Sequence, residues 1–256
     1  MRVLSRWLWP LGILLLGFVT WEIWVRMADT PRWMLPPPSA IARSFRDDRE
    51  LLFDNARVTL LEILLGFGCA LVIGVAVGVA ISSSRILERA MYPIIIASQT
   101  IPMVALAPLL LIWFGYGLLP KVIVTTLVCF FPIAVSTVDG LRAVDREVIA
   151  MLRTFGAGRW RRFWLASVPS ALPSLFSGIR VAITFSVIGA VFGELVGASE
   201  GLGYLMQRAA AQFQTARVFA ALFILSGMGV GLFALATLIE RMALPWRRYV
   251  LEYRDE

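Results

Sequence analysis

The sequence contains several uninterrupted apolar runs, each about as long as a helix that crosses a lipid bilayer. Such a helix needs about 20 consecutive apolar residues. Hydrophobic residues make up 59% of the chain and charged residues only 16%, whereas soluble domains average nearer half and a quarter. The sequence therefore predicts an all-α integral membrane protein with six transmembrane helices. The six predicted spans are residues 7–25, 58–81, 87–114, 119–138, 172–196 and 217–239.

Basic residues gather in alternate connections between these runs, which under the positive-inside rule face the cytoplasm. We therefore expect a multi-pass protein of the cell (inner) membrane with both termini cytoplasmic. The net charge of +7 then reflects topology and not nucleic-acid binding. No small-residue cleavage site follows the first run, so we expect it to be retained. The arginines assigned to the cytoplasm are Arg2, Arg6, Arg85, Arg89, Arg142, Arg146, Arg153, Arg159, Arg161, Arg162, Arg241, Arg247, Arg248 and Arg254.

We treat residues 1–256 as a single transmembrane domain. Residues 1–56 hold the first span and a segment on the outer membrane surface, and residues 57–248 form a five-span core. In the outer segment, Ser39 is expected to cap a short helix whose apolar side is Ile41, Phe45 and Leu51-Leu52. Residues 197–216 are too polar to span. We expect them to form an outer gate or a re-entrant segment, with the gate at Gly197, Gly201, Gly203 and Tyr204 and a short helix over residues 204–214.

Several chemistries are excluded by what the sequence lacks. It has no histidine, so a histidine-based metal site or catalytic triad is ruled out. Cys69 and Cys129 lie inside apolar runs, without metal-ligand spacing, and are expected to be small packing residues. No G-x-x-x-x-G-K-[ST] phosphate loop is present. The chain is therefore predicted not to be an enzyme and to hold no cofactor, and any ATP hydrolysis belongs to another chain.

The third run is interrupted by Pro93, Pro102 and Pro108. Interior prolines free backbone carbonyls, and in a membrane these need protein or water around them. We therefore expect this run to line the translocation path. The alternative for its polar residues is that they only satisfy carbonyls freed by Pro102. The path candidates are Gln99, Thr100 and Met103 in the third span and Ser186 and Glu194 in the fifth.

Two carboxylates, Glu62 and Glu194, lie in or near predicted spans, where ionisable residues are functional candidates. Glu62 can also snorkel to water from a helix end. Glu194 sits between Gly193 and Gly197, where small neighbours allow a gate to close through an arginine such as Arg208. The alternative is a helix-end carboxylate that is paired locally.

The longest polar interruption in the second half of the chain is residues 139–173. Val144, Val148, Met151, Leu152 and Phe155 recur at helical spacing. Gly156-Ala157-Gly158 then favours a break with a left-handed cap. A second, basic and aromatic piece over residues 159–166 is expected to end near Pro169. Two amphipathic helices with a fixed turn indicate a docking surface, and the alternative is a loop lying on the lipid surface.

This loop resembles the EAA loop of ABC-importer permeases, the cytoplasmic segment that fits a groove in the ATPase subunit. With the pattern's glycine on Gly156, its proline falls on Pro169. Its Glu-Ala-Ala falls on Ala150-Met151-Leu152, so the acidic residue is missing there, and Glu147 one turn earlier is the substitute. The resemblance implies a coupling helix between spans four and five. The ATPase-coupling residues it implies are Glu147, Ala150, Arg153, Thr154, Phe155, Gly156, Ala157, Gly158, Arg159, Trp160 and Pro169.

The resemblance extends from about Leu35 to Arg248, and over this range the sequence is similar to those of the nitrate/sulfonate/taurine-type permeases. It implies the type I importer fold, a permease homodimer, an ABC ATPase dimer that binds ATP and Mg, and a periplasmic or lipoprotein substrate-binding protein. Within that family, the sequence most resembles permeases for the pyrimidine precursor of thiamine, with taurine, alkanesulfonate or nitrate as other substrates. The segments that carry the resemblance are 98–115, 118–121, 129–132, 139–142 and 193–204.

The competing reading is an ion-coupled carrier or channel that works without an ATPase. Broken helices and intramembrane acids such as Glu194 are typical of an ion site. A docking loop has no use in such a protein, so residues 139–173 favour the importer.

Overall fold

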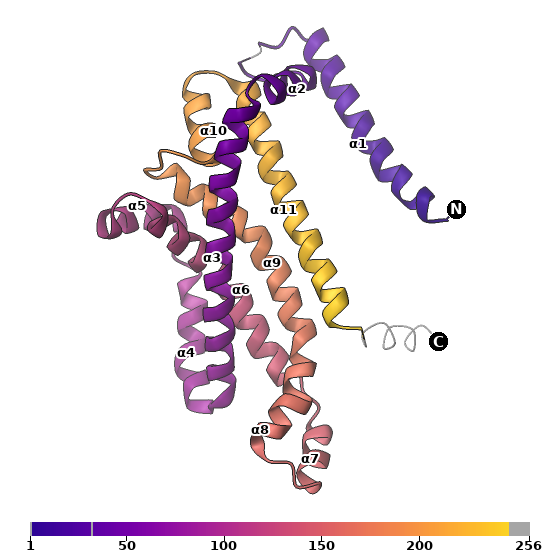
Figure 1. Cartoon of the computed structure of the whole chain (residues 1–256), viewed down its shortest axis with the longest axis vertical. Coiled ribbons are helices and arrows are strands. Elements are labelled where there is room, and N and C mark those ends of the chain that lie inside the picture. Colours follow the sequence, from indigo (N-terminus) through magenta and orange to yellow (C-terminus); the bar gives the residue numbers. More distant parts are fainter. Residues whose placement is uncertain (1, 32, 246–256) are drawn as a thin grey trace. The chain divides into compact units, whose positions relative to one another are not determined.

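The structure is a computed structural model that describes residues 2–31 and 33–245, and in that part of the chain all regular structure is helical (Figure 1). The predicted all-α class is confirmed. Arg247, Arg248, Tyr249 and Arg254 lie outside the described residues. The helices are α1 (Arg2–Met27), α2 (Pro38–Asp47), α3 (Arg49–Ser83), α4 (Arg85–Ser98), α5 (Met103–Phe114), α6 (Leu118–Arg142), α7 (Arg146–Thr154), α8 (Arg159–Arg162), the π-helical turn η1 (Phe163–Ser167), α9 (Val168–Leu195), α10 (Leu202–Ala211) and α11 (Thr215–Ala243).

Four helical segments of the described chain are long and apolar enough to cross a membrane, and a fifth is added if a bent helix pair counts as one span. The chain is thus a multi-pass membrane protein, and the number six stays a prediction, since α1 is not among these segments. The four are Arg49–Ser83, Leu118–Arg142, Arg159–Leu195 and Thr215–Ala243.

The predicted third span is not one helix. It is divided into α4 and α5, and their axes are bent by 97° across the break. Pro102 is the N-cap of α5, with extended backbone, because its ring disfavours continuing a helix through it. Pro93 and Pro108 lie inside α4 and α5 without breaking them. Only one of the three prolines therefore accounts for the interruption.

The chain divides into two compact units: residues 1–59 with 199–226, and residues 60–198 with 227–256. In the first unit, the Glu22 carboxylate accepts hydrogen bonds from the backbone N–H of Ser39 at 3.0 Å and from its hydroxyl at 2.8 Å. A carboxylate at a helix N-terminus satisfies free N–H groups and complements the helix dipole. The residue before α2 is Pro37, so the prediction that Ser39 caps this helix was wrong.

The apolar side of α2 was only partly predicted. Ile41 and Leu52 are buried, whereas Phe45 and Leu51 are exposed. Helix α3 begins at Arg49, well before the predicted start of the second span at residue 58. Residues 49–56, which were assigned to the surface segment, therefore form the first turns of the membrane helix α3.

Two side chains of α3 hold the start of α10. The Asn55 side-chain oxygen accepts the backbone N–H of Gly201, and the Thr59 hydroxyl accepts that of Leu202, each at 2.8 Å. The first turn of a helix has N–H groups without partners in the helix. The Asn55 and Thr59 side chains provide acceptors for two such N–H groups. Helix α10 accordingly begins at Leu202 and ends at Ala211, earlier at both ends than the predicted helix over residues 204–214.

In the second unit, α6 packs against α3 and α9 through glycines. A Cβ built on any of them would meet an α6 atom at 3.0 Å or closer. Small residues let helix backbones approach closely in a membrane. Cys129 is fully buried in this core and donates to the carbonyl of Ala182, which confirms its packing role. The pairs are Gly66–Thr125, Gly74–Ile133, Gly78–Thr137, Gly178–Ser136, Gly189–Thr125 and Gly193–Lys121.

This packing predicts that Gly66→Ala lowers the thermal stability of the purified protein. The new methyl would overlap the Thr125 side chain, and overpacking of this kind typically costs about 1–3 kcal/mol. Gly68→Ala is the matched control, because no atom lies within 4 Å of a Cβ at that position. Melting in detergent, followed by intrinsic fluorescence, should show a lower midpoint for Gly66→Ala only. Equal midpoints for the two variants would contradict the packing described here.

Candidate functional site

Helix α7 and the turn after it have defined caps at both ends. The Asp145 side chain accepts the backbone N–H of Glu147 at 2.8 Å, which is a standard N-cap. At the other end Gly156 has a φ of +75°. The N–H of Gly156 bonds to the Arg153 carbonyl and that of Ala157 to the Leu152 carbonyl, at 3.0 and 2.9 Å. This pair of bonds is a Schellman motif, so the predicted glycine break is confirmed.

The second piece of the loop does not end near Pro169, as the sequence had suggested. Helices α8 and α9 are joined by η1, and residues 159–195 form one continuous helical segment. The reason is that Pro169 lies in the first turn of α9, where proline is tolerated. A displacement of α8 is therefore transmitted directly to the fifth predicted span.

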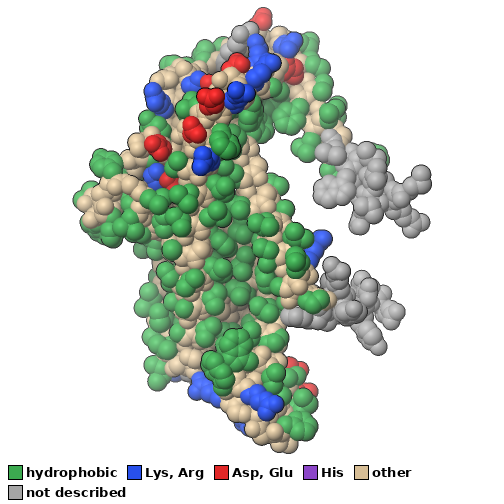
Figure 2. All heavy atoms as spheres, viewed as in Figure 1, with side chains coloured by type: hydrophobic (Ala, Val, Ile, Leu, Met, Phe, Trp, Pro, Cys, Tyr) green, Lys and Arg blue, Asp and Glu red, His purple; other side chains and the backbone are tan. Residues whose placement is uncertain are grey.

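Large apolar side chains of α7, the turn and α8 lie on the surface. No described side chain of α7 or α8 is buried, and Phe155 and Trp160 are 79% and 72% exposed. A few Lys and Arg side chains lie among hydrophobic ones over the same part of the second unit (Figure 2). Exposed apolar groups with a polar rim typically mark an interaction site.

Contacts with α3 fix this surface in place. The Arg159 guanidinium donates to the backbone carbonyl of Ser83 at 3.0 Å. A cavity of about 620 Å³ lies beneath Trp160 and Phe163, with Val79 of α3 and Leu141 of α6 among its lining residues.

The structure brings nearly all of the predicted coupling residues into one helix–turn–helix. Glu147, Ala150, Arg153 and Thr154 lie on α7, and the turn is residues 155–158. Arg159 and Trp160 begin α8, whereas Pro169 lies on α9, beyond η1. Their shared surface is thus established, while their contact with an ATPase stays a prediction.

The predicted path residues fall into two environments. Gln99 and Thr100 are exposed at the break between α4 and α5, and Met103 begins α5. The Thr100 hydroxyl donates to the Ala97 carbonyl at 2.7 Å, whereas the carbonyl that Pro102 leaves without its helical donor is that of Ser98. Ser186 is fully buried on α9 and donates to the Ile183 carbonyl.

Glu194 belongs to a buried charge cluster. It lies beside Glu62, and the Glu62 carboxylate forms an ion pair with the Lys121 ammonium at 2.6 Å. Both glutamates are fully buried. Sequence reasoning singled out the two acids and missed Lys121 as their partner. The available signal was a single basic residue in the otherwise apolar run of α6.

The residues predicted to form the outer gate have the backbone that a sharp turn requires. Gly197 and Gly201 have φ values of +78° and +115°. A side chain at Gly197 would also collide with Leu111 and Tyr116. Gly203 is buried at the start of α10, and Tyr204 is half-buried.

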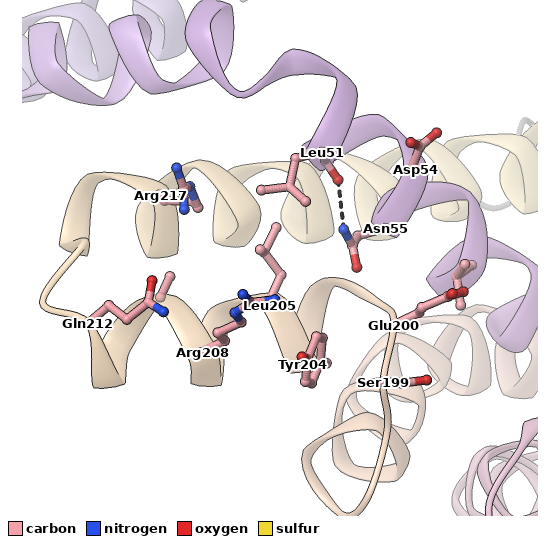
Figure 3. Close-up of a pocket in the computed structure, with 12 residues that line it drawn as sticks. Leu51, Asp54, Asn55, Ser199, Glu200, Tyr204, Leu205, Arg208, Gln212 and Arg217 are labelled. Carbon is pink, nitrogen blue, oxygen red and sulfur yellow. Dashed lines mark hydrogen bonds between the residues drawn. The ribbon is translucent and has the colours of Figure 1, made fainter.

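A pocket of about 560 Å³ lies in the first unit between α3 and α10 (Figure 3). Asp54 and Asn55 line it from α3, and Tyr204 and Arg208 from α10. It therefore offers acidic, basic, amide and aromatic groups within one recess.

Arg217 of α11 also lines this pocket. It is held by the Asp48 carboxylate at 2.6 Å. Hydrogen bonds from Arg217 lower the pKa of the Asp48 carboxyl below its ordinary value, so this carboxylate stays ionised near neutral pH.

A family model described as the binding-protein-dependent transport system inner membrane component matches residues 70–243, the part of the chain that contains the helix–turn–helix. The chain belongs to this family. It is a permease subunit of an ABC importer and not an enzyme, and in this family ATP is hydrolysed by a separate ATPase. Membership favours the importer over the carrier that works without an ATPase.

Relatives in other bacteria match nearly the whole chain. The formylaminopyrimidine transport permease protein ThiX of Halalkalibacterium halodurans is 41% identical, over 93% of this chain and 96% of the relative. The riboflavin transport system permease protein RibX of Chloroflexus aurantiacus is 39% identical, over 96% and 94%. The taurine transport system permease protein TauC of Escherichia coli is 27% identical, over 94% and 93%.

Among solved structures, inward-facing conformations of the MetNI methionine ABC transporter contain a chain of similar fold. The TM-score is 0.65 at 21% identity, and the match covers 78% of this chain and 97% of that chain. This likeness shows the permease fold alone.

Proposed function

We propose that the helix–turn–helix of α7 and α8 couples this importer permease to its ATPase subunits. The observation that carries the proposal is the exposed apolar and basic surface on a turn whose geometry is fixed at both caps. The missing acid of the EAA pattern leaves Glu147, which lies on α7, as the acidic residue of this surface.

A rigid connection between the coupling surface and the membrane supports the same proposal. Helix α8 runs through η1 into α9 without a break. Movement of an ATPase subunit bound at Trp160 would therefore shift α9, which carries Ser186 and Glu194. A flexible linker at the same place would absorb the movement instead.

Gly156→Val should weaken co-purification of the ATPase while membrane insertion stays normal. A β-branched residue is destabilised by about 1–2 kcal/mol in the left-handed conformation that Gly156 adopts, with a φ of +75°. We expect the Schellman turn to open as a result and α8 to change direction. Gly158→Val is the control, because its φ of −63° and ψ of 167° suit a β-branched residue. Both sites leave open space for the added side chain.

Pull-down of the ATPase and ATP-dependent uptake should both fall for Gly156→Val and stay normal for Gly158→Val. Wild-type association and transport in Gly156→Val would refute the coupling role of this turn.

We also infer that the chain has six spans with both termini cytoplasmic and works as a homodimer on an ATPase dimer that binds ATP and Mg. The clustering of arginines at α7 and α8 supports a cytoplasmic loop. The apolar length of α1, whose described side chains are mostly exposed, supports a first span that faces lipid. The substrate-binding protein then docks on the opposite face, near the gate glycines.

Cysteine labelling tests this orientation. In a Cys69→Ser background, a cysteine at Gln207 should react with a membrane-impermeant maleimide in spheroplasts. A cysteine at Thr154 should react only after permeabilisation. Both positions are exposed, and the buried Cys129 gives the unreactive baseline. Labelling of Thr154 from outside would overturn the orientation.

We propose that the imported solute is a small polar organic molecule, with the pyrimidine precursor of thiamine as the leading substrate. The likeness to ThiX at 41% identity supports an aminopyrimidine. The 27% identity to TauC is lower than the 41% identity to ThiX and the 39% identity to RibX, so the likeness supports taurine less. In transporters of this kind the binding protein selects the solute, so the test belongs there.

The binding protein that stimulates this permease–ATPase complex should be stabilised by aminopyrimidines. A ligand that binds only the folded state stabilises the binding protein by mass action and so raises its melting temperature. At a ligand concentration of 100 times Kd the gain in folding free energy is about 2.7 kcal/mol. Thermal shift against a 4-aminopyrimidine, riboflavin, taurine, an alkanesulfonate and nitrate separates the candidates. Stabilisation by taurine and not by the pyrimidine would reverse the assignment.

A further inference from the structure

The cavity of about 620 Å³ in the second unit lies where two membrane-crossing helices end. Helix α3 ends at Ser83 and α6 at Arg142. Ser83 itself lines the cavity, and so does Leu141, the last residue but one of α6. The ends of membrane-crossing helices reach the headgroup region of a bilayer. The cavity is therefore placed at the level where the polar and apolar parts of a lipid meet.

The walls of the cavity are largely apolar. Three helices contribute aliphatic side chains to it: Val79 of α3, Leu141 of α6 and Ile149 of α7. The rings of Trp160 and Phe163 also line it and are stacked, with their centroids 6.0 Å apart. Tryptophan is enriched at membrane–water interfaces. Walls of this kind suit a hydrocarbon chain better than a wholly polar solute.

The charged groups of the cavity are all basic. Arg159 and Arg162 line it, and residues three apart lie on the same face of a helix. No Asp or Glu is among the described residues that line the cavity. A guanidinium group matches the oxygens of a phosphate with two parallel hydrogen bonds. The cavity is therefore suited to an anionic headgroup, and it offers no carboxylate to a headgroup ammonium.

One of the two arginines lacks an acceptor. Arg159 donates to the carbonyl of Ser83 at 3.0 Å, whereas the Nε of Arg162 is buried without a hydrogen-bond partner among the described residues. A buried donor of this kind is costly, and more so when it is charged. A phosphate oxygen in the cavity would supply the missing acceptor.

We propose that this cavity binds the headgroup of an anionic phospholipid. Arg159 and Arg162 hold its phosphate, and the first part of its acyl chains lies against the apolar walls. The volume falls within the range of small-ligand sites, roughly 300–1,000 Å³. Lipid binding here goes beyond solute import, and it holds whether or not α7 and α8 dock an ATPase.

Titration of the full-length permease in detergent micelles with phosphatidylglycerol, followed by native mass spectrometry, tests the site. The wild type should retain one phosphatidylglycerol molecule tightly. Phosphatidylcholine should be retained much more weakly, because its choline cation meets two arginines and no carboxylate. Arg162→Gln should raise the Kd for phosphatidylglycerol about tenfold, the loss expected for one hydrogen bond to a charged group.

Arg161→Gln is the matched control, since Arg161 is exposed beside Arg162 on α8 and does not line the cavity. It should retain phosphatidylglycerol as the wild type does. The Arg162 Nε has no protein acceptor to lose, so Arg162→Gln should keep the wild-type melting temperature in phosphatidylcholine.

A second pair of variants tests the place of the acyl chains. Val79→Phe should fill the apolar part of the cavity and weaken phosphatidylglycerol binding, although both arginines remain. Val72→Phe is its control on the same helix, since Val72 is 70% exposed and does not line the cavity. Glycerol phosphate, which carries the phosphate without the chains, should fail to displace the lipid at equal concentration.

Unchanged phosphatidylglycerol binding in Arg162→Gln, or equally tight binding of phosphatidylcholine, would overturn the proposal. Displacement of the lipid by glycerol phosphate would indicate a site for a soluble anion instead. Loss of the lipid when the ATPase subunits are added would assign the cavity to that partner, and either result also overturns the proposal.

Discussion

The close packing of α6 against α3 and α9 is the constraint on which the second unit depends. In lipid, apolar side chains gain little by leaving one apolar surrounding for another, so helices associate through close van der Waals contact. Glycines at Gly66, Gly74 and Gly78 on α3 and at Gly178, Gly189 and Gly193 on α9 provide that contact. Cys129, Ile133 and Ala182 fill the remaining space. Shape complementarity therefore determines which helices are neighbours.

The same close approach determines where charge can be buried. Gly193 brings the α9 backbone onto the stem of Lys121, and this places Glu194 next to the carboxyl that Lys121 already holds. The ion pair by itself would contribute little, since desolvation offsets much of its attraction. Its value is specificity, because only one register of the three helices brings these groups together.

Much of the architecture could be predicted from composition and local pattern. The apolar runs identified the long helices, and Gly156 identified the turn that follows α7. Local patterns failed where a contact distant in sequence decided the outcome. Ser39 had the residue type of a cap, but its partner is Glu22 on another helix. Lys121 had no local feature that pointed to Glu62, because their pairing depends on how α3 and α6 pack. Pro169 was expected to end a helix, and its position within the first turn of α9 could not be known without the structure.

The π-helical turn at Phe163–Ser167 has a consequence for register. A π turn holds about one residue more than an α turn, and each residue of an α-helix advances the side-chain direction by about 100°. The side chains of α9 are therefore rotated, relative to those of α8, from where an unbroken α-helix would place them. If α8 is fixed by a bound partner, the number of residues between Gly156 and Pro169 determines which face of α9 points to the neighbouring helices. A one-residue deletion within the turn would rotate the side chains of α9 relative to those of α8. A motif of this kind is defined by its spacing as much as by its residues.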